Sequence, residues 1–137
     1  MHDFILHHYD NSPFAEKIRT LLGHKNAHYQ VVKIPVIMPK PDLVALTGGY
    51  RKTPVLQHKN HIYCDTRLMA RVIDEQFGAE SIFPSELSLT ANTMAQWADE
   101  HLFRVAVGLV FSPAGFAVFQ QRVPEKFVET QPTSELR

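Results

Sequence analysis

The stretch FILHHYDNSPFAEKIRTLLG, residues 4–23, combines a strand signal, a polar turn and a helix signal in immediate succession. Phe4–Tyr9 is apolar and then aromatic, which predicts a short β-strand. Ser12 is a favourable N-cap, and Pro13 follows at the first helical position, where a missing N–H costs nothing. The apolar residues that then recur at helical spacing are Phe14, Ile18, Leu21 and Leu22. Gly23 is expected to end this helix.

The alternation of strands and helices continues after this stretch. The predicted elements are a strand at Tyr29–Val36, a short helix at Asp42–Leu46, strands at Val55–Gln57 and Ile62–Cys64, and a helix from Asp65-Thr66 to Gly78. Lys59-Asn60 separates the last two strands by a spacing that suits a tight hairpin. The order β-α-β-α-β-β-α is that of a thioredoxin fold, an α/β fold in which helices cover both faces of a mixed four-stranded sheet. We therefore predict a thioredoxin-like domain over residues 1–80.

The remainder of the chain predicts a second, all-helical domain over residues 88–137, after a linker at 81–88. Thr90 or Asn92 is expected to cap a long helix that ends at Ser112-Pro113. The helix face that we expect to pack comprises Met94, Trp97, His101, Leu102, Val105, Leu109 and Val110. A single helix with such a face needs helical partners, and few residues remain to supply them. We expect an incomplete domain: either a partner chain covers this helix, or a longer parent protein has lost its C-terminal part.

Composition narrows the classes of partner. The 137 residues are 45% hydrophobic and 20% charged, which is typical of a folded soluble protein. Fourteen basic residues balance fourteen acidic ones, so we expect neither a nucleic-acid partner nor a membrane surface. The single cysteine, Cys64, and the absence of an export signal predict a cytoplasmic protein without disulfides. The eight histidines show no metal-ligand spacing, so no metal site is expected.

The first candidate site is Tyr9–Phe14, which joins the carboxyl end of a strand to the amino end of a helix. Open α/β sheets bind ligands at this edge, and a helix N-terminus favours an anion such as a thiolate. The hydroxyl of Ser12 can donate a hydrogen bond to the sulfur of a bound thiol and so lower its pKa. The alternative is that Ser12 serves only as an N-cap, which is the commoner role. Tyr9 offers a second hydroxyl, for which packing at the strand end is the expected role.

The second candidate site is Lys52–Val55. A proline such as Pro54, at the start of this strand of a thioredoxin-type fold, is typically cis, which exposes the backbone of Val55 for pairing with a bound peptide. Only about 5% of X–Pro bonds are cis, so the proline alone is weak evidence.

The third candidate site is Asp65-Thr66, at a helix start. Asp65 can hold an ammonium group, while the hydroxyl of Thr66 and the helix N–H groups can hold a carboxylate, which suits the head group of an α-amino acid. The alternative is a Thr66 cap with an acidic neighbour that the helix dipole favours.

In this order and spacing, the segments resemble the glutathione transferase superfamily, whose N-terminal domain is a thioredoxin fold. The matching stretches are HYDNSPFAEKIR at 8–19, KPDL at 40–43, GYRKTPVL at 49–56 and CDT at 64–66. The resemblance covers the predicted first domain, and the helix that carries Trp97 resembles the first helix of the family's all-helical second domain.

This resemblance implies that the chain binds glutathione as its co-substrate. Ser12 takes the place of the residue that contacts the glutathione sulfur, and is the expected catalytic residue. Val55 would pair with the cysteinyl backbone, and Asp65 and Thr66 would hold the γ-glutamyl group. Either Lys40 or Lys52 would reach the glycyl carboxylate. The full set of expected glutathione-binding residues is Ser12, Phe14, Lys40, Lys52, Thr53, Pro54, Val55, Asp65 and Thr66.

Two departures from the family pattern refine this expectation. The omega-like classes have Cys-Pro-Phe-Ala-Glu where this chain has a serine at position 12. A cysteine there can form a mixed disulfide, whereas a serine can only stabilise a thiolate. We therefore expect conjugation, isomerisation or peroxide reduction rather than thiol-disulfide exchange. Asp65 replaces a more frequent glutamate and shortens the reach to the amino group.

The leading hypothesis is a transferase in which glutathione, held as a thiolate, attacks a small electrophile. The alternative is a non-catalytic glutathione-binding or protein-interaction module, which the incomplete helical domain favours. The resemblance also implies a homodimer.

Overall fold

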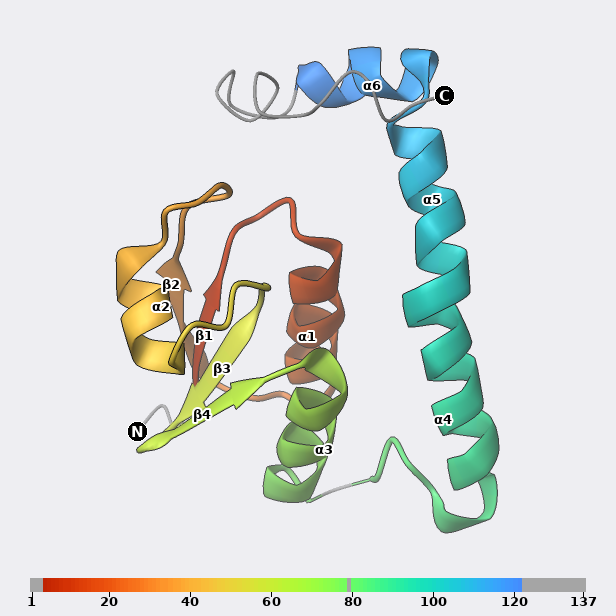
Figure 1. Ribbon diagram of the computed structural model, residues 1–137. Helices are drawn as coiled ribbons and strands as arrows, with labels where there is room; N and C mark the ends of the chain where they lie inside the picture. Colours follow the sequence, from red (N-terminus) through yellow and green to blue (C-terminus); the bar gives the residue numbers. More distant parts are fainter. Residues whose placement is uncertain (1–3, 79, 122–137) are drawn as a thin grey trace. The chain divides into compact units, whose positions relative to one another are not determined.

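The computed structural model describes residues 4–78 and 80–121. The chain divides into two compact units, one that extends to Ile82 and one that begins at Phe83 (Figure 1). The part of the expected second domain beyond Gln121 lies outside the described residues.

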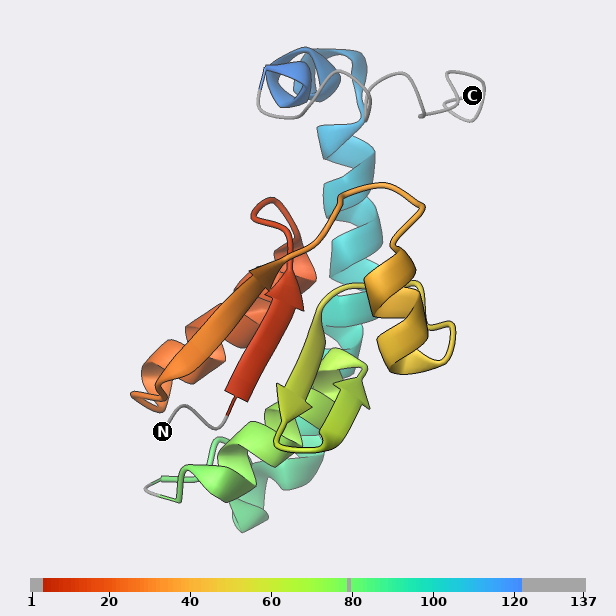
Figure 2. The same cartoon turned by 90° about the vertical axis from the view of Figure 1, so that its left-hand side faces the viewer.

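The first unit has the predicted order of elements. They are β1 (Phe4–His8), α1 (Pro13–His24), β2 (Tyr29–Lys33), α2 (Pro41–Thr47), β3 (Val55–His58), β4 (His61–Cys64) and α3 (Thr66–Gln76). The strands form one sheet in the order β2-β1-β3-β4, in which β2 runs parallel to β1, and β3 runs antiparallel to both β1 and β4. Figures 1 and 2 show α2 on one face of the sheet and α1 and α3 on the other. The mixed four-stranded thioredoxin-like fold is therefore confirmed.

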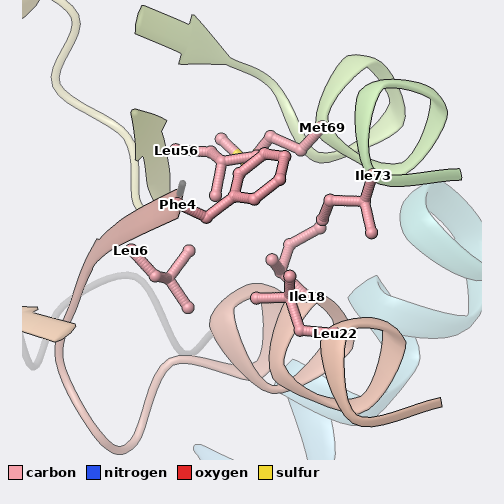
Figure 3. Close-up of a cluster of buried hydrophobic side chains, with 7 residues drawn as sticks. All are labelled: Phe4, Leu6, Ile18, Leu22, Leu56, Met69 and Ile73. Carbon is pink, nitrogen blue, oxygen red and sulfur yellow. The ribbon is translucent and has the colours of Figure 1, made fainter. Parts of the chain in front are cut away.

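The core of this unit lies between the sheet and the pair α1 and α3 (Figure 3). Every other residue of β1 is buried, as expected for a strand with one face against helices. The helices contribute residues four apart, which lie on one face of a helix. The seven core side chains, each at most 1% exposed, are Phe4, Leu6, Ile18, Leu22, Leu56, Met69 and Ile73. Burying a side chain of this size stabilises a fold by about 1.5–3 kcal/mol.

The end of α1 differs from the prediction. Gly23 lies inside the helix, which continues to His24, and Lys25 is the C-cap residue. The left-handed conformation falls instead on Asn26, with φ of 50°. Asparagine tolerates this conformation because its short polar side chain can bond locally, so it replaces the glycine that usually ends a helix.

Two tight turns of the first unit use left-handed residues, and the predicted hairpin turn at Lys59-Asn60 is confirmed. Gly48 has a φ of 67° and is the C-cap of α2. His58 pairs with His61 across the tight hairpin between β3 and β4, and Lys59 has a φ of 55°.

The second unit is helical throughout its described part. It comprises η1 (Ser85–Leu87), α4 (Ser88–Trp97), the π-helical segment η2 (Ala98–Leu102), α5 (Phe103–Val110) and α6 (Pro113–Gln120). The expected caps are wrong, because α4 already begins at Ser88. The amide of Asn92 donates to the carbonyl oxygen of Ser88 at 2.7 Å, and the hydroxyl of Thr93 donates to that of Leu89 at 2.8 Å. For Asn92, one of the two expected caps, this backward bond is the alternative to capping.

The predicted break at Ser112-Pro113 is confirmed. Ser112 caps α6, and its hydroxyl oxygen accepts from the backbone N–H of Gly115 at 3.2 Å. A Cβ atom at Gly115 would lie 2.2 Å from the carbonyl oxygen of Leu109. Only glycine therefore allows α6 to approach the end of α5 this closely.

Large apolar side chains remain exposed on the second unit. Trp97 is 47% exposed and Leu109 is 69% exposed, and no described residue between Phe83 and Gln121 is buried. Met94 is also exposed, so the described residues do not provide the expected packing of Met94 and Trp97.

The helices of the second unit are apolar enough to be compared with a membrane span. No single helix in the described part of the chain is long and apolar enough to cross a membrane. Ser85–Val110 and Pro113–Gln120 together meet the length and composition of a span, but they are bent by 79° at the break.

Candidate functional site

Strand register brings the three predicted site segments to one edge of the sheet. His7 on β1 pairs with Val55 on β3, and Val55 pairs in turn with Cys64 on β4. Because β1 and β4 both run antiparallel to β3, their carboxyl ends lie beside the amino end of β3 (Figure 2). The loop after β1, the residues before β3 and the start of α3 therefore extend beyond the same row of paired residues. Ligands bind at such an edge in open α/β sheets.

Ser12 lies at the amino end of α1. Its extended backbone makes it the N-cap, and its hydroxyl oxygen accepts from the backbone N–H of Ala15 at 3.2 Å. The side chain is buried, and Phe14 follows, half-buried, in the first helical turn. A hydroxyl that accepts through its oxygen still carries a proton to donate. Capping and donation to a bound sulfur are therefore compatible.

Lys40 is brought to the same edge. Its Nζ donates to the hydroxyl oxygen of Thr53 at 3.3 Å and lies 5.4 Å from the centroid of the Tyr9 ring. The residue is only 6% exposed, and burial lowers the pKa of its ammonium group. A buried cation is costly unless it is paired, so this position suits an incoming carboxylate. Lys52, the other expected carboxylate ligand, is exposed on the loop before β3.

The segment around Pro54 corrects one expected role. The Thr53–Pro54 peptide bond is cis, and Pro54 is buried. Val55, however, lies on a central strand and pairs with His7 on one side and Cys64 on the other. Its backbone faces neighbouring strands and is not free to pair with a bound peptide. Thr53, like Lys52 and Pro54, precedes β3, so its backbone lies outside both ladders, and unlike Pro54 it has an N–H to donate.

The start of α3 corrects a second role. Asp65, rather than Thr66, is the N-cap residue, and its Oδ1 accepts from the backbone N–H of Arg67 at 2.8 Å. The cap bond uses one carboxylate oxygen of an exposed side chain. Thr66 is buried, and its hydroxyl oxygen accepts from Nζ of Lys17 at 3.3 Å. Asp65 and Thr66 thus both lie at this edge, and Lys17 links α1 to α3 beside them.

Tyr50 is a site residue that the sequence did not single out. Burial is the main cause that raises the pKa of its hydroxyl, and the negative charge of Asp65 raises it further. A hydrogen bond to the backbone of Asp65 acts in the opposite direction. Tyr50 therefore lies against Asp65, and its place in the GYRKTPVL stretch was the available signal. Lys17 was also missed, since its partner Thr66 lies forty-nine positions away.

The one cysteine of the chain, Cys64, ends β4 at this edge. Burial raises the pKa of the Cys64 thiol, so the thiol stays neutral at physiological pH. Among residues 4–78 and 80–121, no group of three or more His, Cys, Asp or Glu side chains is placed to hold a metal ion.

Proteins of known family are similar to this chain in sequence and in fold. The family described as glutathione S-transferase, N-terminal domain, matches residues 6–81. A probable glutathione S-transferase from Solanum tuberosum is 28% identical over 75 residues, which cover 55% of this chain and 35% of that protein. Glutathione S-transferase U4 from Arabidopsis thaliana is 25% identical over 97 residues, which cover 69% of this chain and 43% of that protein.

A solved structure extends the similarity beyond the first unit. The crystal structure of a GST-like protein from Pseudomonas syringae is 51% identical, with a TM-score of 0.78, over 89% of this chain and 44% of that one. The chain therefore spans less than half the length of each of these three proteins. On the family match over residues 6–81, the chain belongs to the glutathione S-transferase superfamily, and its first unit is the N-terminal domain of that family.

Proposed function

We propose that this chain binds glutathione at the edge formed by β1, β3 and β4, and stabilises its thiolate for attack on a small electrophile. The observation that carries the proposal is the row His7, Val55 and Cys64, beyond which the three site segments meet. The family match favours a transferase over a non-catalytic module.

The geometry supports one orientation of the tripeptide. The sulfur lies at Ser12 and the N-terminus of α1, where a hydroxyl proton and helix N–H groups favour a negative charge. The γ-glutamyl group lies at Asp65 and Thr66, where the exposed carboxylate of Asp65 takes the ammonium group. We assign the cysteinyl backbone to Thr53 in place of Val55.

For the glycyl carboxylate, the geometry favours Lys40 over Lys52. Lys40 is buried at the edge and already donates to Thr53, whereas Lys52 is exposed. A carboxylate there would pair a desolvated ammonium group.

The chemistry follows from the charge on sulfur. The thiol loses its proton to water, and the thiolate is stabilised by the Ser12 hydroxyl and the helix end. The sulfur lone pair then forms a bond to the electrophilic atom of the second substrate, whose leaving group or π bond takes up the displaced electron pair. The same nucleophile serves conjugation, isomerisation and peroxide reduction. Each unit by which the thiol pKa falls stabilises the thiolate by about 1.4 kcal/mol relative to the thiol.

Ser12→Ala tests this role. We expect the affinity for glutathione, measured by calorimetry, to change by less than about threefold, and turnover of a chromogenic electrophile to fall about tenfold because the thiol pKa rises by about one unit. Ser112→Ala, which removes the matching N-cap of α6, controls for the loss of a cap. Unchanged turnover in Ser12→Ala would contradict the role of Ser12. Glutathione binding by the wild-type chain without any turnover would favour the non-catalytic module.

A homodimer is the proposed assembly. The exposed apolar side chains of α4 and α5, Trp97 and Leu109 among them, favour a protein partner over solvent. Light scattering should give twice the chain mass of 15.6 kDa, and a monomer mass at micromolar concentration would contradict the proposal.

A further inference from the structure

The guanidinium group of Arg19, on α1, contacts three residues in and around the loop that carries Ser12. Its Nη1 lies 2.9 Å from Nδ1 of His8, the last residue of β1. Its Nη2 donates to the carbonyl oxygen of Asp10 at 3.1 Å, and its Nε donates to Oε2 of Glu16 at 2.8 Å. One side chain therefore joins the end of β1, the loop and the first turn of α1.

Ser12 lies within these contacts. Its backbone N–H donates to the carbonyl oxygen of Tyr9 at 3.2 Å, and its own carbonyl oxygen accepts from the N–H of Glu16 at 3.0 Å. The loop from β1 to α1 has only four residues, 9–12. A shift of Asp10, two residues before Ser12, therefore displaces the hydroxyl that the site uses.

The contact with Arg19 dictates the protonation state of His8. An arginine side chain stays protonated and can only donate, so Nδ1 of His8 must accept. The imidazole is then neutral, with its single proton on Nε2. His8 is only 1% exposed. A second proton would direct an N–H and a positive charge at the guanidinium group in a buried position, which the contact cannot survive.

Burial and the positive charges around His8 also favour its neutral form. The charged groups that act on His8 are Arg19 from α1, Lys33 from β2 and Asp10 from the loop, and Glu16 pairs with Arg19. Burial is the largest cause that lowers the pKa of His8 from its ordinary value of 6.5, and the positive charges of Lys33 and Arg19 lower it further. A backbone hydrogen bond to Tyr9 and the charge of Asp10 oppose them. Lys33 is itself ion-paired with Asp10.

We propose that Arg19 is a positioning residue for Ser12, and that protonation of His8 releases Arg19 and disorders the thiol-stabilising loop at acidic pH. The role of Arg19 in fixing the loop is argued from contacts within the free chain. Only its effect on a bound thiol rests on the proposed function.

Whether Arg19 fixes the loop can be tested on the free 137-residue chain, without glutathione. Nuclear magnetic resonance follows the ring of His8 and the exchange protection of the Ala15 and Glu16 amides, which both bond to Ser12, as the pH falls from about 8 to about 5. We expect their protection to fall about tenfold as His8 gains its proton, while the amide of Met69 in α3 keeps its protection. Constant protection through the titration of His8 would overturn the proposal.

Two variants separate the titration from the contact. His8→Gln keeps a hydrogen-bond acceptor but cannot gain a proton, so its protection should not depend on pH in this range. Arg19→Gln should raise the pKa of His8 toward its ordinary value. This variant still tests the proposal if His8→Gln fails to fold. Arg104→Gln, an exposed arginine on α5, is the control. An unchanged pKa of His8 in Arg19→Gln would overturn the proposal.

The pKa of the bound glutathione thiol distinguishes a positioning role of Arg19 from a purely structural one, because a structural role would leave this pKa unchanged. In Arg19→Gln we expect the pKa of the bound thiol, measured by thiolate ultraviolet absorbance, to rise by about one unit, with an affinity within about threefold of wild type. An unchanged thiol pKa would overturn the positioning role. If the free chain behaves as expected but binds no glutathione, the hold on the loop is supported and the proposed function fails.

Discussion

The two units of the chain differ in how their helices are stabilised. In the first, α1 and α3 bury Leu22 and Ile73 completely against the sheet. In the second, α4 and α5 leave side chains such as Leu109 more than half exposed. Caps and helical periodicity thus define helices in both units, but only the first unit buries a core within the described residues. All the proposed glutathione contacts come from this unit, so the site has a rigid support of its own.

Matched leucine substitutions give the largest expected difference between the units. Leu22→Ala should lower the free energy of unfolding of the first unit by about 4 kcal/mol, because it leaves a cavity in a closed core. Leu109→Ala should change that value by less than about 0.5 kcal/mol, because its side chain is 69% exposed. Chemical denaturation of both variants checks the difference.

The chain carries separate optical probes for this measurement. All four tyrosines, Tyr9, Tyr29, Tyr50 and Tyr63, lie in the first unit, and the single tryptophan, Trp97, lies in the second. The tyrosine signal should follow the shift caused by Leu22→Ala. Equal destabilisation by the two leucine variants would refute the contrast between the units.

The ion pair between Lys25 and Asp74 gives the next largest effect. The Lys25 Nζ lies 2.6 Å from Oδ1 of Asp74, and both side chains are nearly buried. Asp74 also accepts from the Ser81 hydroxyl and the Ile82 N–H, so it holds the end of the first unit. Lys25→Met should destabilise this unit by about 3 kcal/mol, because it leaves an unpaired buried carboxylate.

Lys33→Met is the matched control for Lys25→Met. Lys33 pairs with Asp10, but both side chains are exposed, so little change is expected in denaturation at pH 8. If Lys33→Met lowered the free energy of unfolding as much as Lys25→Met, burial would not determine how much these ion pairs stabilise the unit.

A smaller effect should appear as a pH dependence of the first unit. The pKa of His8 is lowered by folding, so the unfolded chain binds more protons between that pKa and about 6.5. The free energy of unfolding should therefore fall as the pH drops below about 6.5. His8→Gln should flatten this part of the profile, and an unaltered slope would mean that other groups cause it. Asp10 and Asp74, whose pKa values are also lowered, destabilise the fold only below about pH 4.

The smallest effect on the first unit is expected from Gly115→Ala. A methyl group at this position collides with the carbonyl oxygen of Leu109, so amide exchange in α6 should accelerate. The free energy of unfolding reported by the tyrosines should stay within about 0.5 kcal/mol of wild type. A larger tyrosine shift would show that the units are energetically coupled.

Local signals predicted much of the fold. The Ser12 cap, the helix break at Ser112-Pro113, the turn at Lys59-Asn60 and the order of helices and strands along the first unit all follow from short-range patterns that the structure keeps. The cap of α3 was assigned to Thr66 and proved to be Asp65, because both residue types cap helices well and the local pattern does not separate them.

Features that depend on distant residues could not be predicted. Val55 was expected to pair with a ligand because its sequence position does not reveal strands on both sides of it. Lys40 and Lys52 were indistinguishable until the loop before α2 placed Lys40 on Thr53. The contact between His8 and Arg19 joins a strand to a helix and has no sequence pattern of its own.

The most direct test of glutathione binding at this edge is calorimetric titration of glutathione into the full chain and into Asp65→Asn. Asparagine keeps the helix cap and tolerates the φ of 79° at this position, so the substitution removes only the charge proposed to hold the γ-glutamyl ammonium group. Glu75→Ala, on the last turn of α3, is the control. We predict binding by the wild-type chain and by Glu75→Ala, and an affinity at least about tenfold lower for Asp65→Asn. No heat at millimolar glutathione, or equal affinity in all three proteins, would contradict the account.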